Sequence, residues 1–180
     1  MSPTDEAAPE RPRDRRVFFA LWPDGAVRTQ IARVTKDVVS RSGGRPIAKD
    51  RLHATVAFLG NLTAAGLDAA RAVPPIQVGA FELALDTIGV FAKTRVLWVG
   101  PRTVPAALLD LERRLWDALE QRGFVREPRI YQPHVTLARR ARPVEEAVDG
   151  VLWPVADLAL VESLPDGRNV HYEVLDTWPL

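Results

Sequence analysis

The chain has 180 residues, of which 47% are apolar and 26% charged, a mixture typical of one globular domain. The 24 lysines and arginines nearly balance the 23 acidic residues, so the net charge of +1 excludes a histone-like attraction to nucleic acid. The absence of cysteine excludes disulfide scaffolds, zinc–thiolate sites, iron–sulfur clusters and thiol nucleophiles. No run approaches the roughly 18 apolar residues of a membrane-spanning helix, so we expect a cytoplasmic protein without membrane association.

The first 15 residues form a charged leader interrupted by proline. We expect a flexible N-terminal tail over residues 1–15 and a single bilobal domain over residues 16–180. A solvated tail is favoured over phosphate contacts for the four arginines that end the leader, because charge runs usually face solvent. These arginines are Arg11, Arg13, Arg15 and Arg16.

The first half of the chain predicts two strands and two helices. Short apolar runs predict strands at 17–22 and 53–60. Apolar residues at helical spacing follow Asp24, a plausible N-cap, and predict a helix over 25–41. A shorter helix is expected over 63–71.

The second half predicts more strands than helices. Alternating or continuous apolar residues predict strands at 81–85 and 96–99, which together indicate an antiparallel pair. Leucines and a tryptophan at helical spacing predict a helix over 105–122. Three further strands are expected, the last two forming a hairpin around a Pro-Asp-Gly turn: 131–138, 158–161 and 170–175.

The order strand, helix, strand occurs twice, which indicates an internal repeat. The segments HATVAF (53–58) and HVTLAR (134–139) are identical at their first, third and fifth positions. Because alternate residues of a strand share one face, each of two related lobes is predicted to present His, Thr and Ala from one strand face.

The repeated His-x-Thr pattern indicates acid–base chemistry. His53 with Thr55, and His134 with Thr136, would each place a ring nitrogen and a hydroxyl over one spot. Imidazole has a pKa near 6.5, so one ring can take a proton from water while the other gives one to a leaving alkoxide. β-Propensity alone explains a threonine in a strand, but the pairing with histidine favours a role in phosphodiester chemistry. His171 lies outside the repeat and is expected to be a surface residue.

Arg139 is the candidate cation, since it follows the second motif where Phe58 follows the first. A cation there would stabilise charge on the phosphoryl oxygens. Strict alternation would turn Arg139 to the opposite face, so it reaches the site only if the strand ends or bulges there. The alternative is an exposed basic turn shared with Arg140 and Arg142.

Motifs for other chemistries are absent from the sequence. There is no phosphate-binding GxxxxGK[ST] loop, GxGxxG turn, GxSxG elbow or HExxH helix. No acidic residue stands at a motif position to complete a metal shell with the histidines. We therefore expect a metal-free site without a cofactor.

The tandem HxTxxF and HxTxxR motifs, the opening VFFALWP and the strand run ending FLG resemble the 2H phosphoesterase superfamily. Within it, the chain is most similar to the RNA 2′,3′-cyclic phosphodiesterases, over about residues 16–180. The resemblance implies an α+β fold with two pseudo-symmetric lobes of mainly antiparallel sheet, flanked by helices around a central cleft.

The resemblance also implies roles for the repeated residues. His53 and His134 would be the acid–base pair, and Thr55, Thr136 and Arg139 would hold the phosphate. The implied reaction is hydrolysis of a 2′,3′-cyclic phosphate end of RNA or a nucleotide to a 2′-phosphomonoester, by a monomer. Two alternatives stay open: ligation or cleavage of 2′-5′ linkages, and a non-catalytic module that binds RNA ends. Which histidine is acid and which is base also stays open.

Overall fold

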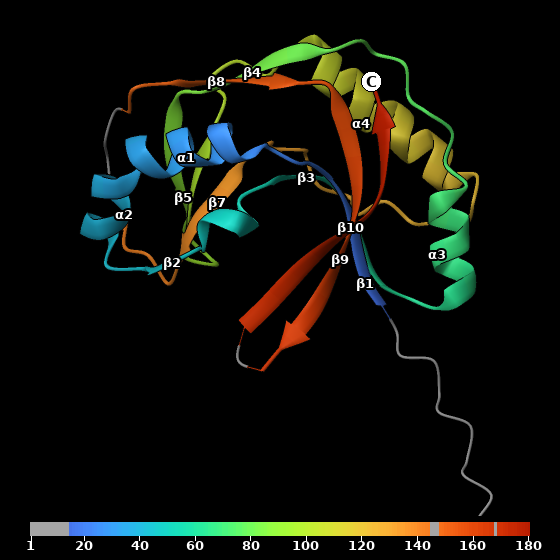
Figure 1. Cartoon of the computed structure of the whole chain (residues 1–180), viewed down its shortest axis with the longest axis horizontal. Coiled ribbons are helices and arrows are strands. Elements are labelled where there is room, and N and C mark those ends of the chain that lie inside the picture. The colour runs from blue at the N-terminus through green and yellow to red at the C-terminus, as the bar shows by residue number, and fades with distance from the viewer. Residues whose placement is uncertain (1–14, 145–147, 168) are drawn as a thin grey trace, which may run out of the picture.

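The computed structural model describes residues 15–144, 148–167 and 169–180. Its framework is an antiparallel sheet in two halves, in the order β10-β9-β1-β3 and then β7-β6-β5, with β2 beside β7 (Figure 1). The strands of the first half are β1 (Arg15–Leu21), β3 (Ala54–Leu62), β9 (Asp157–Asp166) and β10 (Asn169–Pro179). Those of the second half are β2 (Arg45–Pro46), β5 (Thr87–Phe91), β6 (Val96–Gly100) and β7 (Val135–Arg139).

The two half-sheets meet at β3 and β7, where Ala54 pairs with Val135. Because one residue pair joins the two half-sheets, β3 and β7 diverge on either side of that pair. The units β1-α1-β3 and β6-α4-β7 confirm the predicted repeat, and the α+β fold of two lobes is confirmed with it.

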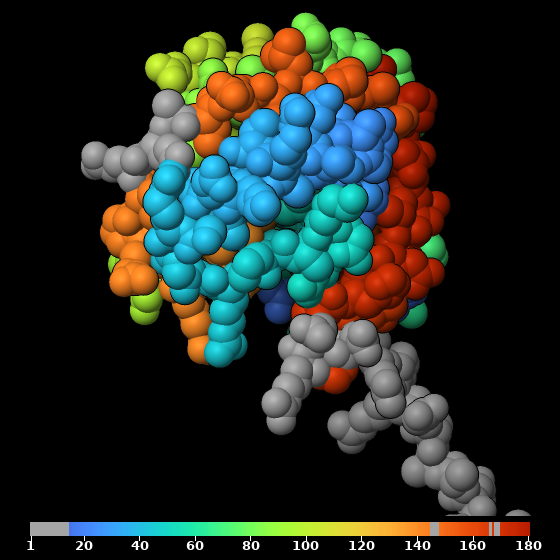
Figure 2. All heavy atoms as spheres, turned by 60° about the vertical axis from the view of Figure 1, so that its left-hand side comes forward, coloured from blue at the N-terminus to red at the C-terminus, as the bar shows by residue number. Residues whose placement is uncertain are grey.

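The helices are α1 (Gly25–Val34), α2 (Lys36–Ser42), α3 (Ala64–Arg71) and α4 (Ala106–Glu120), with a 3-10 turn η1 (Lys49–Arg51). Asp24 caps α1 as predicted, since its Oδ1 accepts from the backbone N–H of Val27 at 2.8 Å. Figure 2 shows α1 and α2 side by side on one face of the molecule, above the segment that leads through β2 to η1. None of the helices in the described ranges is long and apolar enough to cross a membrane.

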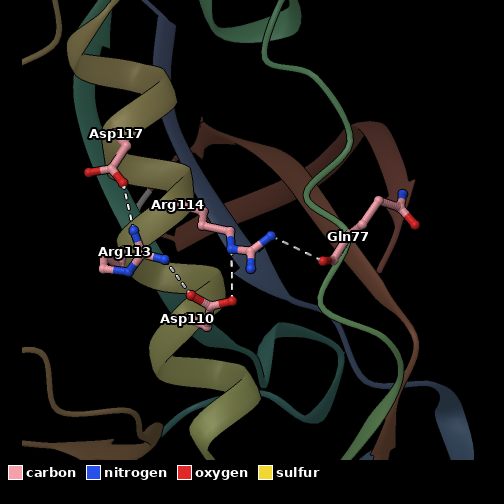
Figure 3. A network of polar contacts seen from close by, with 5 residues as sticks. All are labelled: Gln77, Asp110, Arg113, Arg114 and Asp117. Atoms are coloured by element: carbon pink, nitrogen blue, oxygen red, sulfur yellow. Dashed lines mark hydrogen bonds and ion pairs between the residues drawn. The ribbon is translucent and has the colours of Figure 1, made fainter.

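Helix α4 shows why an amphipathic pattern is a dependable signal. Its apolar face is buried in the core through Leu108, Leu111, Leu115 and Leu119. The opposite face carries ion pairs between residues three or four apart, and Arg114 also donates to the backbone oxygen of Gln77 at 3.4 Å (Figure 3). Exposed pairs of this kind contribute little to stability because water screens them, so burial of the apolar face dominates.

The predicted helix over 25–41 is wrong in one respect, because it is divided at Thr35. The Thr35 hydroxyl donates to the backbone oxygen of Ile31 at 2.8 Å, and its backbone leaves helical geometry with φ −101° and ψ 0°. A threonine that bonds back to the preceding turn commonly bends a helix.

The predicted pairing of 81–85 with 96–99 is wrong. Strand β4 (Phe81–Leu85) pairs instead with β8 (Val151–Val155) in a separate two-stranded sheet, and β6 pairs with β5. Asp86 explains the change, because its N–H donates to the Gly100 oxygen and its carboxylate accepts from the Arg102 N–H at 2.7 Å. These bonds end β4 and start β5 against β6.

Other strands also begin or end at residues different from those predicted. Strand β7 begins at 135 rather than 131, since Pro133 has no N–H for a ladder. The predicted hairpin is confirmed and is longer than expected, as β9 and β10. Residues 1–14 of the expected tail lie outside the described residues, whereas Arg15 already belongs to β1 and forms an ion pair with Glu162.

Among the glycines of the sheet, Gly89 leaves the least room for a side chain. It lies opposite Trp98 in the β5–β6 pair, and a Cβ on it would be 2.1 Å from the indole ring. Overpacking of this kind costs typically 1–3 kcal/mol. We expect Gly89→Ala to lower the free energy of unfolding by about that amount in urea denaturation. Gly25→Ala is the matched control, because its Cβ would contact nothing within 4 Å, and equal stability of both variants would contradict this packing.

Candidate active site

Both His-x-Thr strands contain a β-bulge at the same place in the repeat. In β3, Phe19 pairs with Ala57 and Ala20 with Thr55, so Val56 is the extra residue. In β7, Leu97 pairs with Ala138 and Trp98 with Thr136, so Leu137 is the extra residue. Each bulge shifts the side chains that follow it to the other face of the strand.

The bulges correct the predicted face of Ala57 and Ala138 and bring Arg139 to the face of the motif. Ala57 and Ala138 do not share a face with the histidines and threonines, because they are buried in the core at 1% and 0% exposure. Phe58 and Arg139, the next residues of the two strands, lie on the same face as the threonines instead. Phe58 and Arg139 therefore both border the same cavity as Thr55 and Thr136, which is the condition that Arg139 required.

The pairing of Ala54 with Val135 sets the two motifs against each other. In antiparallel register, the positions on either side of this pair fall opposite one another, 53 with 136 and 55 with 134. Each histidine thus neighbours the threonine of the other lobe. Ala54 and Val135 themselves are fully buried on the opposite face.

The residues of the two motifs border two cavities. The larger, the arginine cavity, has a volume of about 440 Å³ and is bordered by His53, Thr55, Thr136 and Arg139. The second, the Glu112 cavity, has a volume of about 330 Å³ and contains His134 in its wall. Thr55 and Phe58 border both, so the motif strands form the boundary between the two spaces.

The two imidazoles are held in the same way. Nδ1 of His53 lies 2.7 Å from the backbone oxygen of Arg51, and Nδ1 of His134 lies 2.8 Å from that of Gln132. A carbonyl can only accept, so Nδ1 carries the proton in both rings and donates it. In the neutral ring, Nε2 then has the free lone pair, and in the charged ring it has the second proton to donate.

His53 is packed among aromatic rings. Phe18 and Trp22 stack on it with ring centroids 4.9 and 5.5 Å away, and Tyr172 meets it edge-on at 5.1 Å. Burial lowers the pKa of His53 to about 4, helped by the positive charges of Arg28 and Arg139 and by His134, while the Arg51 carbonyl opposes the shift. His53 is therefore neutral in the free protein at pH 7.

His134 has a less enclosed setting. The ring of Phe91 meets it edge-on at 4.9 Å, and Trp98 lies 6.3 Å away. Burial lowers the pKa of His134 as well, and the Gln132 carbonyl opposes this.

Several residues that shape the site were missed by sequence reasoning. The carbonyls of Arg51 and Gln132 carry no side-chain signal, although both stand two residues before a motif histidine. Phe18 was predictable in principle, since β1 lies beside β3 and Phe18 pairs with Phe58. Arg16, which the sequence grouped with the solvated arginines of the leader, lies in β1 and borders the arginine cavity. His171 is exposed on β10, as predicted. Within the described ranges, no group of three or more His, Cys, Asp or Glu side chains is placed to hold a metal ion.

Two histidines and two threonines, carried by duplicated strands at the boundary between two adjoining cavities, are the arrangement expected of a two-histidine phosphoesterase. The model of the 2′-5′ RNA ligase superfamily matches residues 23–166. An RNA 2′,3′-cyclic phosphodiesterase of Escherichia coli is 32% identical over 92% of this chain and 97% of its own. A protein of the same description from Thermus thermophilus is 29% identical over 92% of this chain and 90% of its own.

Comparison with solved structures supports the same family. The structure of E. coli LigT complexed with 3′-AMP superposes with a TM-score of 0.85 at 30% identity, covering 93% of this chain and 98% of LigT. The chain belongs to the 2′-5′ RNA ligase superfamily, the 2H phosphoesterases.

The lowered pKa of His53 predicts a pH dependence of stability. The unfolded ring binds a proton near pH 6.5 and the folded ring near pH 4, so the free energy of unfolding falls as pH is lowered through this window. The loss from this group amounts to roughly 3 kcal/mol at most. Thermal unfolding between pH 7 and 4.5 should show the decline, and His53→Gln should flatten it. His171→Gln, on the exposed face of β10, is the control, and an unchanged slope in His53→Gln would contradict the assignment.

Proposed function

We propose that this protein hydrolyses the 2′,3′-cyclic phosphate ends of RNA to 2′-phosphomonoesters, with His53 and His134 as the acid–base pair. The observation that carries the proposal is the matched geometry of the two imidazoles, each with Nδ1 held by a carbonyl and Nε2 free. The relatives described as RNA 2′,3′-cyclic phosphodiesterases support the substrate class. The LigT complex with 3′-AMP supports a nucleotide ligand for this cleft.

The reaction needs one proton removed and one supplied. One neutral histidine accepts through Nε2 a proton from the attacking water, as the new P–O bond forms. The other histidine, protonated, gives its Nε2 proton to O3′ as the P–O3′ bond breaks. The product keeps the phosphate on O2′, and the next cycle needs one proton moved between the rings or exchanged with solvent.

The phosphoryl oxygens gain negative charge in the transition state. The hydroxyls of Thr55 and Thr136 and the guanidinium of Arg139 are fixed donors that can stabilise this charge without reorganising. A bound anion also favours the charged form of a neighbouring imidazole, which opposes the effect of burial on the pKa of His53 and His134. The substrate therefore helps to create the protonation state that the reaction uses.

A second candidate activity is cleavage or ligation of 2′-5′ linkages. The Glu112 cavity favours it, because it lies across Thr55 from the arginine cavity and is lined by rings such as Phe91 and Trp116. A second nucleoside, joined through the same phosphorus, would have space there.

The reaction is tested with a short RNA ending in a 2′,3′-cyclic phosphate, in excess EDTA, with the product identified as the 2′- or 3′-phosphate. We expect the 2′-phosphate. His53→Ala and His134→Ala should each lower kcat about 10²-fold to 10⁴-fold while the RNA still binds.

His171→Ala should retain wild-type kcat, because His171 borders neither cavity. Tight binding of this RNA without turnover by the wild-type protein would support an RNA-end-binding module instead. Turnover that depends on added metal, or a 3′-phosphate product, would contradict the mechanism.

The bulge at Leu137 predicts different roles for two adjacent arginines. Arg139→Gln should lower kcat/KM by about 10-fold to 100-fold, because a charge-assisted hydrogen bond to phosphate is lost. Arg140→Gln should change it less than threefold, because Arg140 borders neither cavity. Equal losses of kcat/KM in the two variants, measured on the same RNA, would contradict a specific phosphate contact by Arg139. They would indicate that the turn acts through its general positive charge.

A further inference from the structure

The arginine cavity holds more positive charge than the proposed reaction needs. Arg16 and Arg51 border it together with Arg139, and these three come from β1, η1 and β7. No carboxylate is among the described residues of its wall, and none of the three arginines forms an ion pair with a described residue. Three cationic groups therefore border the cavity without a carboxylate among the described residues of its wall.

The arginines of the neighbouring cavity are paired, although Lys93 also borders that cavity. Arg126 is paired with Glu112, through Nη2 at 2.7 and 2.8 Å from the two carboxylate oxygens. Arg129 is paired with Glu127 at 3.0 Å. Both arginines of the Glu112 cavity are thus neutralised within the described protein, whereas those of the arginine cavity are left for a ligand.

Arg16 is exposed and Arg51 half-buried, and each guanidinium makes one contact with the protein. The guanidinium carbon of Arg16 lies 4.9 Å from the centre of the Phe58 ring. Nη1 of Arg51 donates to the backbone oxygen of Val170 at 3.2 Å, which connects η1 to the β9–β10 hairpin. The remaining N–H groups of both guanidiniums stay available for an anion.

A 2′,3′-cyclic phosphate carries one negative charge, which Arg139 already balances. Three guanidiniums that border one cavity attract more negative charge than one phosphate carries, so the cavity matches a substrate with more than one phosphate. In a nucleotide whose O2′ and O3′ are both in the cyclic ester, O5′ is the ribose oxygen left to carry another phosphate.

We infer that Arg16 and Arg51 bind a second phosphate, attached to O5′ of the nucleoside that carries the cyclic phosphate. The inference rests on the proposed function and deepens it. The substrate is then either a chain with an internucleotide phosphate at this position or a 5′-phosphorylated mononucleotide, and a free nucleoside 2′,3′-cyclic phosphate is a poorer substrate than both.

The inference is tested first by binding, which needs no turnover. Calorimetric titration compares adenosine 2′-monophosphate with adenosine 2′,5′-bisphosphate. We expect the bisphosphate to bind the wild-type protein at least 10-fold more tightly. Arg16→Gln and Arg51→Gln should each reduce this preference about 10-fold, with the affinity for the monophosphate changed less than threefold. Arg33→Gln, an exposed arginine on α1 outside both cavities, should keep the preference.

Turnover then distinguishes the two sources of the second phosphate. The substrates are adenosine 2′,3′-cyclic phosphate, its 5′-phosphorylated form, and the ApA dinucleotide with the same cyclic end. A gain in kcat/KM for both larger substrates, lost in Arg16→Gln and Arg51→Gln, supports recognition of any 5′ phosphate. A gain for the dinucleotide alone, lost in the same variants, supports an RNA chain.

Two results would overturn the inference: no preference of the wild-type protein for the bisphosphate, or a preference that survives in both variants. A loss that is equal for all three substrates would also overturn it, because Arg51 would then act only by holding His53. Absence of turnover with all substrates, alongside an arginine-dependent preference for the bisphosphate, would reject the proposed reaction and retain the second phosphate site.

Discussion

The geometry of the cleft depends on the pairing of Ala54 with Val135, the point at which the two half-sheets are joined. Antiparallel pairing at this point places each histidine across from the threonine of the other lobe. The bulges at Val56 and Leu137 then return Phe58 and Arg139 to the same side. One residue pair between the lobes and one bulge repeated in each lobe therefore assemble the site.

The repeat is symmetric in its backbone and asymmetric in its surroundings. Both imidazoles are fixed through Nδ1 by a carbonyl two residues earlier, so the two rings present the same atom. Their neighbours differ, because His53 stacks with Phe18 and Trp22 while His134 meets Phe91 edge-on. The position occupied by Phe58 in one lobe is occupied by Arg139 in the other, so the cation comes from one side. Such asymmetry is what a reaction needs when one group must take a proton and the other must give one.

The fold class and the repeat were predictable from the sequence, because duplicated motifs and periodic apolar patterns are local signals. Of the five candidate site residues, four border the arginine cavity and His134 borders the Glu112 cavity. Sequence reasoning failed where a single residue overrides the pattern. Thr35 divides the predicted helix over 25–41 by bonding to Ile31, and Asp86 sends the chain after β4 into a different sheet. Alternation also predicted the wrong face for Ala57 and Ala138, since a bulge depends on register with a neighbouring strand and has no reliable signature in the strand itself. The arginine cavity was missed for a related reason, as Arg16 and Arg51 reach it from elements distant in sequence.

In the proposed reaction both imidazoles face one phosphate through Nε2. Long-range ¹H–¹⁵N NMR of the histidine rings, with and without adenosine 2′-monophosphate, measures this directly. In the free protein at pH 7, both rings should show a protonated Nδ1 and a bare Nε2. On titration, the Nε2 resonances of His53 and His134 should shift together with one Kd, while those of His171 stay unchanged. A shift of one ring alone, or a proton on Nε2 rather than Nδ1 in either free ring, would contradict the account.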